Sequence, residues 1–330
     1  MSALAVAVVA GGPSAEANVS RTSARAVRAA LEEAGHRPLL LELDAALAGR
    51  LVSASVDVVF PVTHGPLGED GCLQGLLEVL GLPYVGSGVL ASALAASKPH
   101  AKALFRKASL PVADELLLRC DDALPEAATR ARAELGGAVV IKPASGGSAI
   151  GTTRLRADAE MDHWVAALRA AFAVDDTALV ERFVPGFEVT CGVIEDGSGL
   201  RALPPPLITS KAAEWYDFRS RYAAGGSEHQ CPAPLPERIT ARVQEVAELA
   251  FRALGCRDLG RVDFVVGEGD DPRAVTLLEV NTLPGMTSTS LFPEAAAVAG
   301  IGFPSLCAGL AERAEARPRR ARPVEIPMPD

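Results

Sequence analysis

Aromatic residues are scarce in this sequence, at 5%, and basic residues are fewer than acidic ones, which gives a formal charge of -9. Proteins that bind nucleic acids usually need aromatic platforms for the bases or a basic face for the phosphate backbone. We therefore expect no nucleic-acid partner. The acidic balance does not exclude small phosphate ligands, because a few local cations are enough to hold them.

Long apolar runs are also absent: no stretch reaches the ~18 residues that a membrane-spanning helix needs. The apolar start lacks a preceding basic segment, which argues against a signal peptide. No CxxC pair and no histidine at zinc spacing is present. We expect a cytoplasmic protein without a membrane partner, whose cysteines are reduced and buried: Cys72, Cys120, Cys191, Cys231, Cys256 and Cys307.

The chain does contain a regular alternation of strand and helix patterns. A short apolar strand over residues 4–10 is followed by the Gly-rich loop GGPSAE and an amphipathic helix. Further buried strands are predicted at 37–43 and 56–62. This alternation is typical of an α/β fold with a parallel sheet, in which loops at the strand ends carry the chemistry.

The 330 residues are enough for two or three structural units. We predict an N-terminal α/β substrate-binding domain at 1–98, followed by a central unit at 99–184 and a C-terminal unit at 185–314. In the last unit, an irregular polar loop is expected from about 207 to 233. The Pro- and Arg-rich residues 315–330 are expected to form a flexible tail.

A predicted hairpin in the third unit pairs GRVDFVV with AVTLLEVN. Alternation along a strand puts Arg261 and Asp263 on one face, and Glu279 and Asn281 on one face opposite Leu278. If the strands pair, two carboxylates and an amide oxygen gather as a ligand set suited to Mg²⁺. The alternative is the solvent-facing polar side of an antiparallel sheet. The Gly/Pro turn NTLPGMTSTSL after the second strand favours the metal site.

The loop ASGGSAIG follows the strand VVIK, and its glycines would let backbone N–H groups approach an anion. Lys142 at the strand end and Lys98 are candidate phosphate contacts. The loop lacks the GK[ST] of a Walker A motif and the dinucleotide fingerprint, which excludes a dehydrogenase. A flap between two strands fits better. A simple turn and an exposed surface lysine are the alternatives.

Four polar residues lie near predicted element ends, and two of them could contact a ligand. Glu16 lies at a helix start, where its carboxylate could hold an ammonium group or act only as a capping residue. His64 follows a strand end, although an ordinary buried or surface histidine is common there. Glu69 and Asp70 are interpreted as part of a loop or helix start rather than as a second metal site.

The stretch ALVERFVPGFEVT is interpreted as an interdomain connection whose backbone could contact an adenine edge. Glu181 would then lie near the base and Glu188 near the ribose. Both could equally be surface carboxylates.

Together these segments resemble one family, the D-alanine–D-alanine ligases of the ATP-grasp fold. The resemblance runs from about residue 4 to about residue 313. It is carried by GGPSAE, HGPLGEDGCLQG, GLPYVGSGVLASALAASK, VIKP with GGSAIG, QCPA, GRVDF and LLEVNTLPGMTSTSLFP, which occur at matching order and spacing. The resemblance implies a fold of mixed α/β (α+β) class, with an N-terminal parallel α/β domain followed by two ATP-grasp subdomains.

The resemblance also implies the site residues. Contacts to ATP would come from Lys98, Lys142, Ser148, Glu181, Phe183, Val184, Glu188 and Arg221. Two Mg²⁺ ions, replaceable by Mn²⁺, would be bound by Asp263, Glu279 and Asn281. The two D-alanines would contact Glu16, His64, Arg261, Gly285, Ser290 and Leu291. The catalytic set would be Glu16, Ser148, Tyr222, Arg261 and Ser290, with the first three closing the active-site loop through hydrogen bonds.

The implied reaction is ATP-dependent joining of two D-alanines through a D-alanyl phosphate, for peptidoglycan precursor synthesis, in a cytoplasmic homodimer. Three positions depart from the family pattern: Arg221 replaces a lysine, Arg219 a glutamate and Ala149 a serine. Two alternatives therefore stay open, a ligase with another acceptor such as D-serine, and a nucleotide-binding homologue with impaired catalysis. The retained Tyr222 favours an amine acceptor.

Overall fold

The N-terminal part of the molecule is built on a small parallel sheet. In the computed structural model, which describes residues 3–210, 226–287 and 289–318, strand β1 (Ala5–Ala10) lies between β2 (Arg37–Glu42) and β3 (Val58–Pro61), parallel to both. Its helices are α1 (Ala17–Glu33), α2 (Leu47–Ala54), α3 (Cys72–Leu80) and α4 (Val89–Ala96). The predicted parallel sheet is confirmed, and its central strand is buried on both faces, as parallel sheets require.

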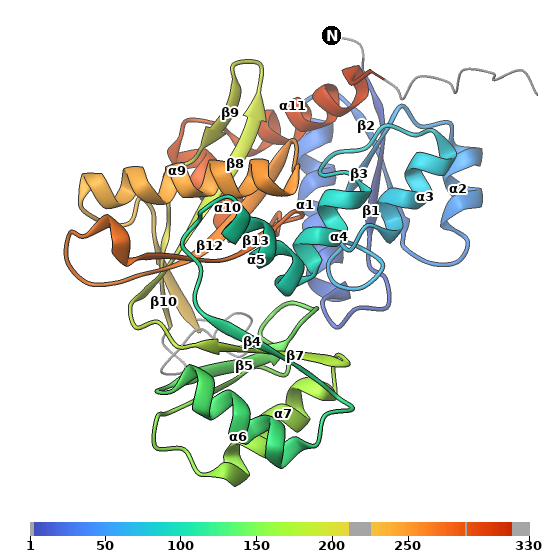
Figure 1. The fold of residues 1–330 in the computed structure, drawn as a ribbon. Helices are drawn as coiled ribbons and strands as arrows, with labels where there is room; N and C mark the ends of the chain where they lie inside the picture. Colours follow the sequence, from blue (N-terminus) through green and yellow to red (C-terminus); the bar gives the residue numbers. More distant parts are fainter. Residues whose placement is uncertain (1–2, 211–225, 288, 319–330) are drawn as a thin grey trace, which may run out of the picture.

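The second sheet is antiparallel and lies at the opposite end of the molecule (Figure 1). Its strand order is β4 (Glu115–Arg119), β7 (Thr177–Arg182), β5 (Val139–Pro143) and β6 (Thr153–Leu155). Helices α6 (Leu124–Leu135) and α7 (Met161–Phe172) pack on it around the buried side chain of Trp164. Because β5 and β6 are antiparallel neighbours, the Gly-rich loop between them is a flap joining two strands, as predicted.

The third sheet carries the C-terminal hairpin. Its order is β11 (Ser227–Gln230), β10 (Leu207–Ser210), β8 (Phe187–Asp196), β12 (Leu259–Val266) and β13 (Val275–Asn281), and β9 (Gly199–Ala202) pairs with β8. A 3₁₀ turn, Pro272–Ala274, precedes β13. One core joins this sheet to α9 (Glu237–Leu254) and α5 (Lys98–Lys107). Thus α5, although it begins at the boundary predicted at residue 98, packs on the third sheet rather than on the second.

The two ends of the described chain pack together. Helices α10 (Leu291–Val298) and α11 (Phe303–Ala316) share one core with α1 and the first sheet, and Figure 1 shows α11 beside the N-terminal strands. The predicted tail at 315–330 starts too early, because α11 continues to Ala316 and Arg317 donates through Nη2 to both carboxylate oxygens of the buried Asp258. Residues 319–330 lie outside the described part. The other predicted domain boundaries remain predictions.

The hairpin of β12 and β13 forms with the predicted partners, Arg261 opposite Asn281 and Asp263 opposite Glu279. A β-bulge follows, because the next pair is Phe264 with Leu277. The expectation that Leu278 faces away from Glu279 is therefore wrong. The bulge lets both residues line the same cleft, while Leu277 turns into the core.

Two further expectations are corrected by the structure. The segment 207–233 is not irregular throughout, since β10 and β11 pair as antiparallel strands at its ends. The cysteines are all free, but not all are buried: Cys72 and Cys120 are exposed. Cys72 is the first residue of α3, where its side chain remains in solvent.

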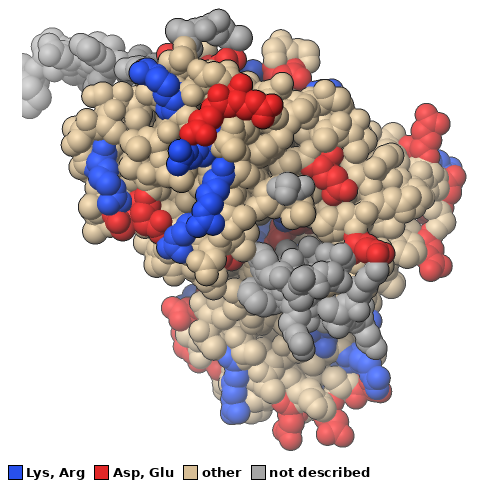
Figure 2. All heavy atoms as spheres, turned by 180° about the vertical axis from the view of Figure 1, so that it is seen from behind, with Lys and Arg blue, Asp and Glu red and all other residues tan. Residues whose placement is uncertain are grey.

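Figure 2 shows one face of the molecule, on which acidic and basic side chains lie interspersed. Within the described ranges, none of the helices is by itself long and apolar enough to cross a membrane; α10 and α11 meet the length and composition criteria only as a pair bent by 102°.

Candidate active site

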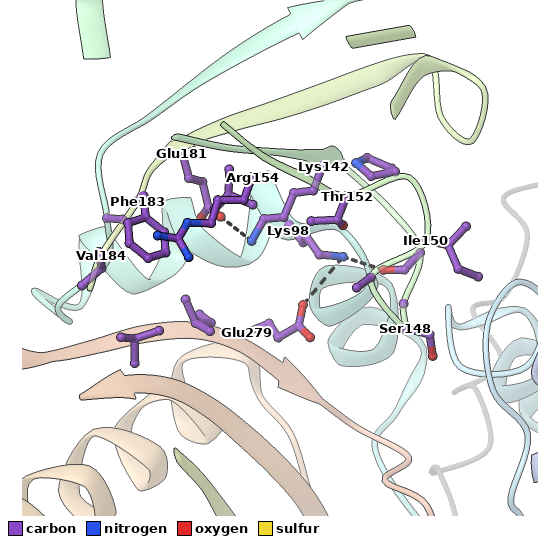
Figure 3. Close-up of a pocket in the computed structure, with 18 of the residues that line it drawn as sticks. Lys98, Lys142, Ser148, Ile150, Thr152, Arg154, Glu181, Phe183, Val184 and Glu279 are labelled. Atoms are coloured by element: carbon purple, nitrogen blue, oxygen red, sulfur yellow. Dashed lines mark hydrogen bonds and ion pairs between the residues drawn. The ribbon is translucent and has the colours of Figure 1, made fainter. Parts of the chain in front are cut away.

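A cleft lies between the second and third sheets, and residues from both sides line it. The second sheet contributes Lys142, Glu181 and the flap of residues 145–150, while β13 contributes Glu279 from the opposite side (Figure 3). Lys98 reaches the cleft from the start of α5. The sequence-predicted candidates from three separate stretches therefore meet in one place.

The flap connects the second sheet with the N-terminal domain. Ser148 and Ala149 both have left-handed backbone conformations, with φ of 54° and 55°, which fold the loop tip back sharply. The Ser148 hydroxyl donates a hydrogen bond of 2.5 Å to Glu16, and the Lys98 ammonium donates one of 2.5 Å to the Gly146 carbonyl. Two hydrogen bonds to residues outside the loop thus fix its position, so the loop is not a simple turn.

Two lysines, both largely shielded from solvent, face two carboxylates in the cleft. Lys142 forms an ion pair with Glu181, and Lys98 lies 3.7 Å from Glu279 (Figure 3). Burial alone would lower the pKa of Lys142, but Glu181 and Glu279 more than offset this and raise it. Burial does lower the pKa of Lys98, although Glu279 acts against it. The side chains of Lys98 and Lys142 are 11% and 13% exposed, so the alternative of an exposed surface Lys98 is wrong.

The polar face of the hairpin also turns toward the cleft. Arg261 donates to both oxygens of Asp263, at 2.8 and 2.9 Å, and the Thr190 hydroxyl donates to the same carboxylate at 2.7 Å. Asn281 accepts a bond from the backbone of Leu283 through its amide oxygen. The side chains of Arg261 and Asp263 are 14% and 15% exposed, which does not fit a solvent-facing side of a sheet.

This face provides oxygen ligands but not a preformed metal-binding cluster. In the described ranges no three His, Cys, Asp or Glu side chains cluster at metal-binding distances. Asp263, Glu279 and Asn281 nevertheless line the same part of the cleft as Arg261. Two carboxylates with an amide oxygen suit Mg²⁺, which usually takes its remaining ligands from phosphates and water.

The cleft continues beyond Arg261 toward the N-terminal domain. Glu16 is the residue before α1 and His64 follows β3, and both line this part of the cleft. Burial lowers the pKa of His64, although Glu16 opposes the shift. Gly285, Ser290 and Leu291 close the far side, and a side chain at Gly285 would place Cβ 2.8 Å from the Ser290 hydroxyl.

At the other end, Phe183, Val184 and Glu188 line the cleft next to Glu181. Arg154, on β6, stacks over the Phe183 ring at 3.8 Å from its centroid. Arg154 could not be predicted as a cleft residue, because a lone arginine in TTRL carries no signal that it will stack on the Phe183 ring, which follows β7. Glu181 itself is 4% exposed, so it is not a surface carboxylate.

Tyr222 and Arg221, together with Arg219, lie outside the described residues. Of the hydrogen-bonded set Glu16, Ser148 and Tyr222, the structure therefore describes the first contact only.

Glu69, predicted only as a loop or helix-start residue, also lines the cleft. It lies in the loop before α3, as expected, and accepts a 2.8 Å hydrogen bond from the backbone of Gly65. Burial raises its pKa to about 7, and the nearby carboxylates of Glu16 and Glu279 add to the shift. The segment GEDG in the sequence indicated a turn, but it did not indicate that the Glu69 side chain would be buried.

The raised pKa predicts a pH-dependent stability. Between the ordinary pKa of a glutamate and about 7, the folded state holds a proton on Glu69 that the unfolded state has lost, so this stabilisation declines as pH rises through that window. We expect the difference in melting temperature, wild type minus Glu69→Gln, to decrease as the pH rises from about 5 to about 8. Thermal melts of both proteins across this range test it. A constant difference would contradict the protonation of Glu69.

The two sheets enclose a pair of shielded lysines, with a glycine-rich flap on one side and a carboxylate-bearing hairpin on the other. This arrangement defines an ATP-grasp ligase. The family profile described as "D-ala D-ala ligase C-terminus" matches residues 104–312, and that described as "D-ala D-ala ligase N-terminus" matches residues 44–87. The chain belongs to the D-alanine–D-alanine ligase family.

Individual relatives support this assignment over nearly the whole chain. A D-alanine–D-alanine ligase of Acidiphilium cryptum is 44% identical over 94% of this chain and 99% of its own length, and one of Desulforamulus reducens is 44% identical over 92% and 96%. The structure of the D-alanine–D-alanine ligase of Bacillus anthracis superposes with a TM-score of 0.80 at 30% identity, covering 94% of this chain and 97% of that one. The structure of that ligase complexed with ATP gives 0.78 at 27% identity, covering 95% and 97%. The predicted fold class is confirmed.

Proposed function

We propose that the chain joins two D-alanine molecules to D-alanyl-D-alanine, with conversion of ATP to ADP and phosphate, for peptidoglycan precursor synthesis in the cytoplasm. The observation that carries this proposal is the convergence, in one cleft, of the two lysines and the flap with the carboxylates of the hairpin. The full-length similarity to curated D-alanine–D-alanine ligases supports the choice of substrate.

ATP would lie along the cleft between the two sheets. Phe183, Val184 and Glu188 line the end suited to the base and ribose, and Lys98, Lys142 and the flap line the end suited to the phosphates. The lysines would neutralise phosphate oxygens as point charges, while the flap offers backbone N–H groups. Glu181 would act here by holding Lys142 rather than by touching the base, since the two form an ion pair.

Mg²⁺ would be held by Asp263, Glu279 and Asn281, whose oxygens fit a hard cation. When bound, the metal would neutralise phosphate charge and help to align the transferred group. Mn²⁺, which takes the same oxygen ligands, is the expected substitute. The ion pair of Arg261 with Asp263 supports a role for the guanidinium next to the proposed metal.

In the first step a carboxylate oxygen of D-alanine would attack the γ-phosphorus in line, and ADP would leave, giving an acyl phosphate. Glu16, with His64 nearby, would orient the ammonium group of this D-alanine. The contact between Ser148 and Glu16 would hold the flap over the reacting centre and keep water from the acyl phosphate.

In the second step the amine of another D-alanine would attack the acyl carbon, lose a proton, and displace phosphate. Arg261 would stabilise the negative oxygen that forms on the carbonyl. Ser290 and Leu291, at the start of α10 with Gly285 close by, would hold the carboxylate of the second D-alanine.

Mass spectrometry of products from ATP, Mg²⁺ and D-alanine tests the proposal, with L-alanine as the matched control substrate. We expect D-alanyl-D-alanine and ADP in equal amounts, and no dipeptide from L-alanine. ATP binding without dipeptide would contradict the proposal, and turnover only with another acceptor such as D-serine would change its substrate.

We also propose that the protein is a homodimer. Light scattering of the purified protein tests the dimer. A monomeric mass at micromolar concentration would contradict it.

A further inference from the structure

Lys102 is a buried lysine for which the mechanism above has no use. It lies on α5, one turn after Lys98, and is 1% exposed. Lys102 forms ion pairs with Glu115, at 2.8 Å, and with Glu181. It is not among the residues that line the nucleotide cleft, so it acts from behind Glu181.

The strand register explains why a cation is needed there. Glu115 on β4 lies directly opposite Glu181 on β7. Two carboxylates at opposed positions of neighbouring strands repel each other, and burial strengthens the repulsion. Lys102 bridges the two carboxylates, although its helix packs in the core of the third sheet. The lysine therefore also joins the two sides of the cleft.

The strand register also explains how Lys102 is linked to Lys142 in the cleft. Val140 on β5 lies opposite Glu181, and Lys142 is two residues further along on the same face. Glu181 consequently pairs with Lys142 on the cleft side and with Lys102 behind. Burial would raise the pKa of Glu181, but these two lysines lower it to about 2, so its charge is retained.

Side chains of opposite charge thus alternate from the surface to the cleft. Each forms an ion pair with the next, in the order Arg106, Glu115, Lys102, Glu181 and Lys142. Lys102 is the central cation. If its charge is removed, Lys142 becomes the only cation that pairs with Glu181 in the described part, with Glu115 opposite.

We propose that Lys102 is a positioning residue for ATP binding. It neutralises the carboxylates of Glu115 and Glu181, so that the charged ammonium group of Lys142 remains able to contact the phosphates. This inference rests on the proposed role of Lys142 in binding ATP. It assigns Lys102 no contact with the nucleotide.

Lys102→Met tests the inference, because methionine keeps much of the side-chain volume and removes the charge. We expect the KM for ATP and the Kd for a non-hydrolysable ATP analogue to rise about tenfold, the size of one weakened charge-assisted contact. The KM for D-alanine should change less than about twofold, within the spread of substitutions away from a site. Lys107→Met, an exposed position on the same helix, is the matched control and should match the wild type.

A second substitution separates charge balance from packing. Adding Glu115→Gln to Lys102→Met removes the opposed carboxylate and is expected to recover most of the lost ATP affinity. A purely structural role would instead lower activity with both substrates alike and gain nothing from Glu115→Gln.

Wild-type ATP affinity in Lys102→Met would overturn the inference, as would equal changes in both KM values. If that variant does not fold, Lys102→Gln, whose amide can still donate to Glu181, takes its place with the same expected results. Failure of both to fold would overturn the inference in favour of a structural role. Failure of the wild type to bind ATP would instead count against the proposed function.

Discussion

Asp263→Asn and Glu279→Gln are each expected to reduce dipeptide formation by on the order of 10³-fold, since metal charge stabilisation is worth several kcal/mol and each 1.36 kcal/mol is a factor of ten. Both substitutions keep the shape of the side chain and remove one negative charge. Without that charge Mg²⁺ loses a strong oxygen ligand, and the transferred phosphoryl group loses the charge that neutralises it.

The fold should survive these changes. In Asp263→Asn, the amide oxygen of the new side chain could still accept the hydrogen bond that Thr190 now donates to the Asp263 carboxylate. Within the described residues, the one ion pair of the Glu279 side chain is the 3.7 Å contact with Lys98. Coupled detection of ADP measures the rate, and titration of Mg²⁺ should show that a higher concentration of the metal is needed for half-maximal rate.

Asp271→Asn, at the exposed turn of the same hairpin, is the control for both substitutions and should leave the rate unchanged. Near-normal ligation by the Asp263 and Glu279 variants would defeat the metal assignment.

The hairpin shows how far the sequence could predict the site. Alternation of side chains along a strand is set by backbone geometry, so the shared face of Arg261 and Asp263 could be deduced without coordinates. The pairing of Asp263 with Glu279 then required only that the two strands meet, and they do. The Gly-rich flap was likewise predictable, because the apolar strand VVIK precedes it and the strand-like segment TTRL follows it.

The position of Leu278 could not be predicted in the same way. A bulge adds one residue to a strand and reverses the alternation beyond it, and the segment VTLLEVN contains no glycine that would indicate one. Sequence alternation counted back from Asn281 therefore placed Glu279 correctly and Leu278 wrongly.

The burial of Lys102 and of Glu69 could not be predicted, for a different reason. Their importance depends on partners far along the chain: Glu181 for Lys102, and Glu16 and Glu279 for Glu69. A lysine in the segment AKALFRK is ordinarily a solvent-exposed helix residue. It is buried only because α5 packs on the third sheet while the Lys102 ammonium pairs with two carboxylates of the second, and no local pattern records that arrangement.

The second large effect is expected at Lys142. We predict that Lys142→Met weakens ATP binding roughly 10- to 100-fold, since a hydrogen bond to a charged group contributes about 1.5–3 kcal/mol. The carboxylates beside Lys142 raise its pKa, so it stays a cation throughout the neutral range. The variant should fold, because Glu181 keeps its second partner, Lys102. Calorimetric titration with a non-hydrolysable ATP analogue measures the affinity.

The double variant Lys142→Met with Glu181→Gln decides what the lysine does. If Lys142 served mainly to neutralise Glu181, removing both charges would restore the affinity for the analogue. If Lys142 holds phosphate, as proposed, the double variant must bind as weakly as Lys142→Met alone, because Glu181 does not replace the missing cation. Recovery to within about twofold of the wild type, the spread expected of a neutral substitution, would therefore contradict the phosphate contact.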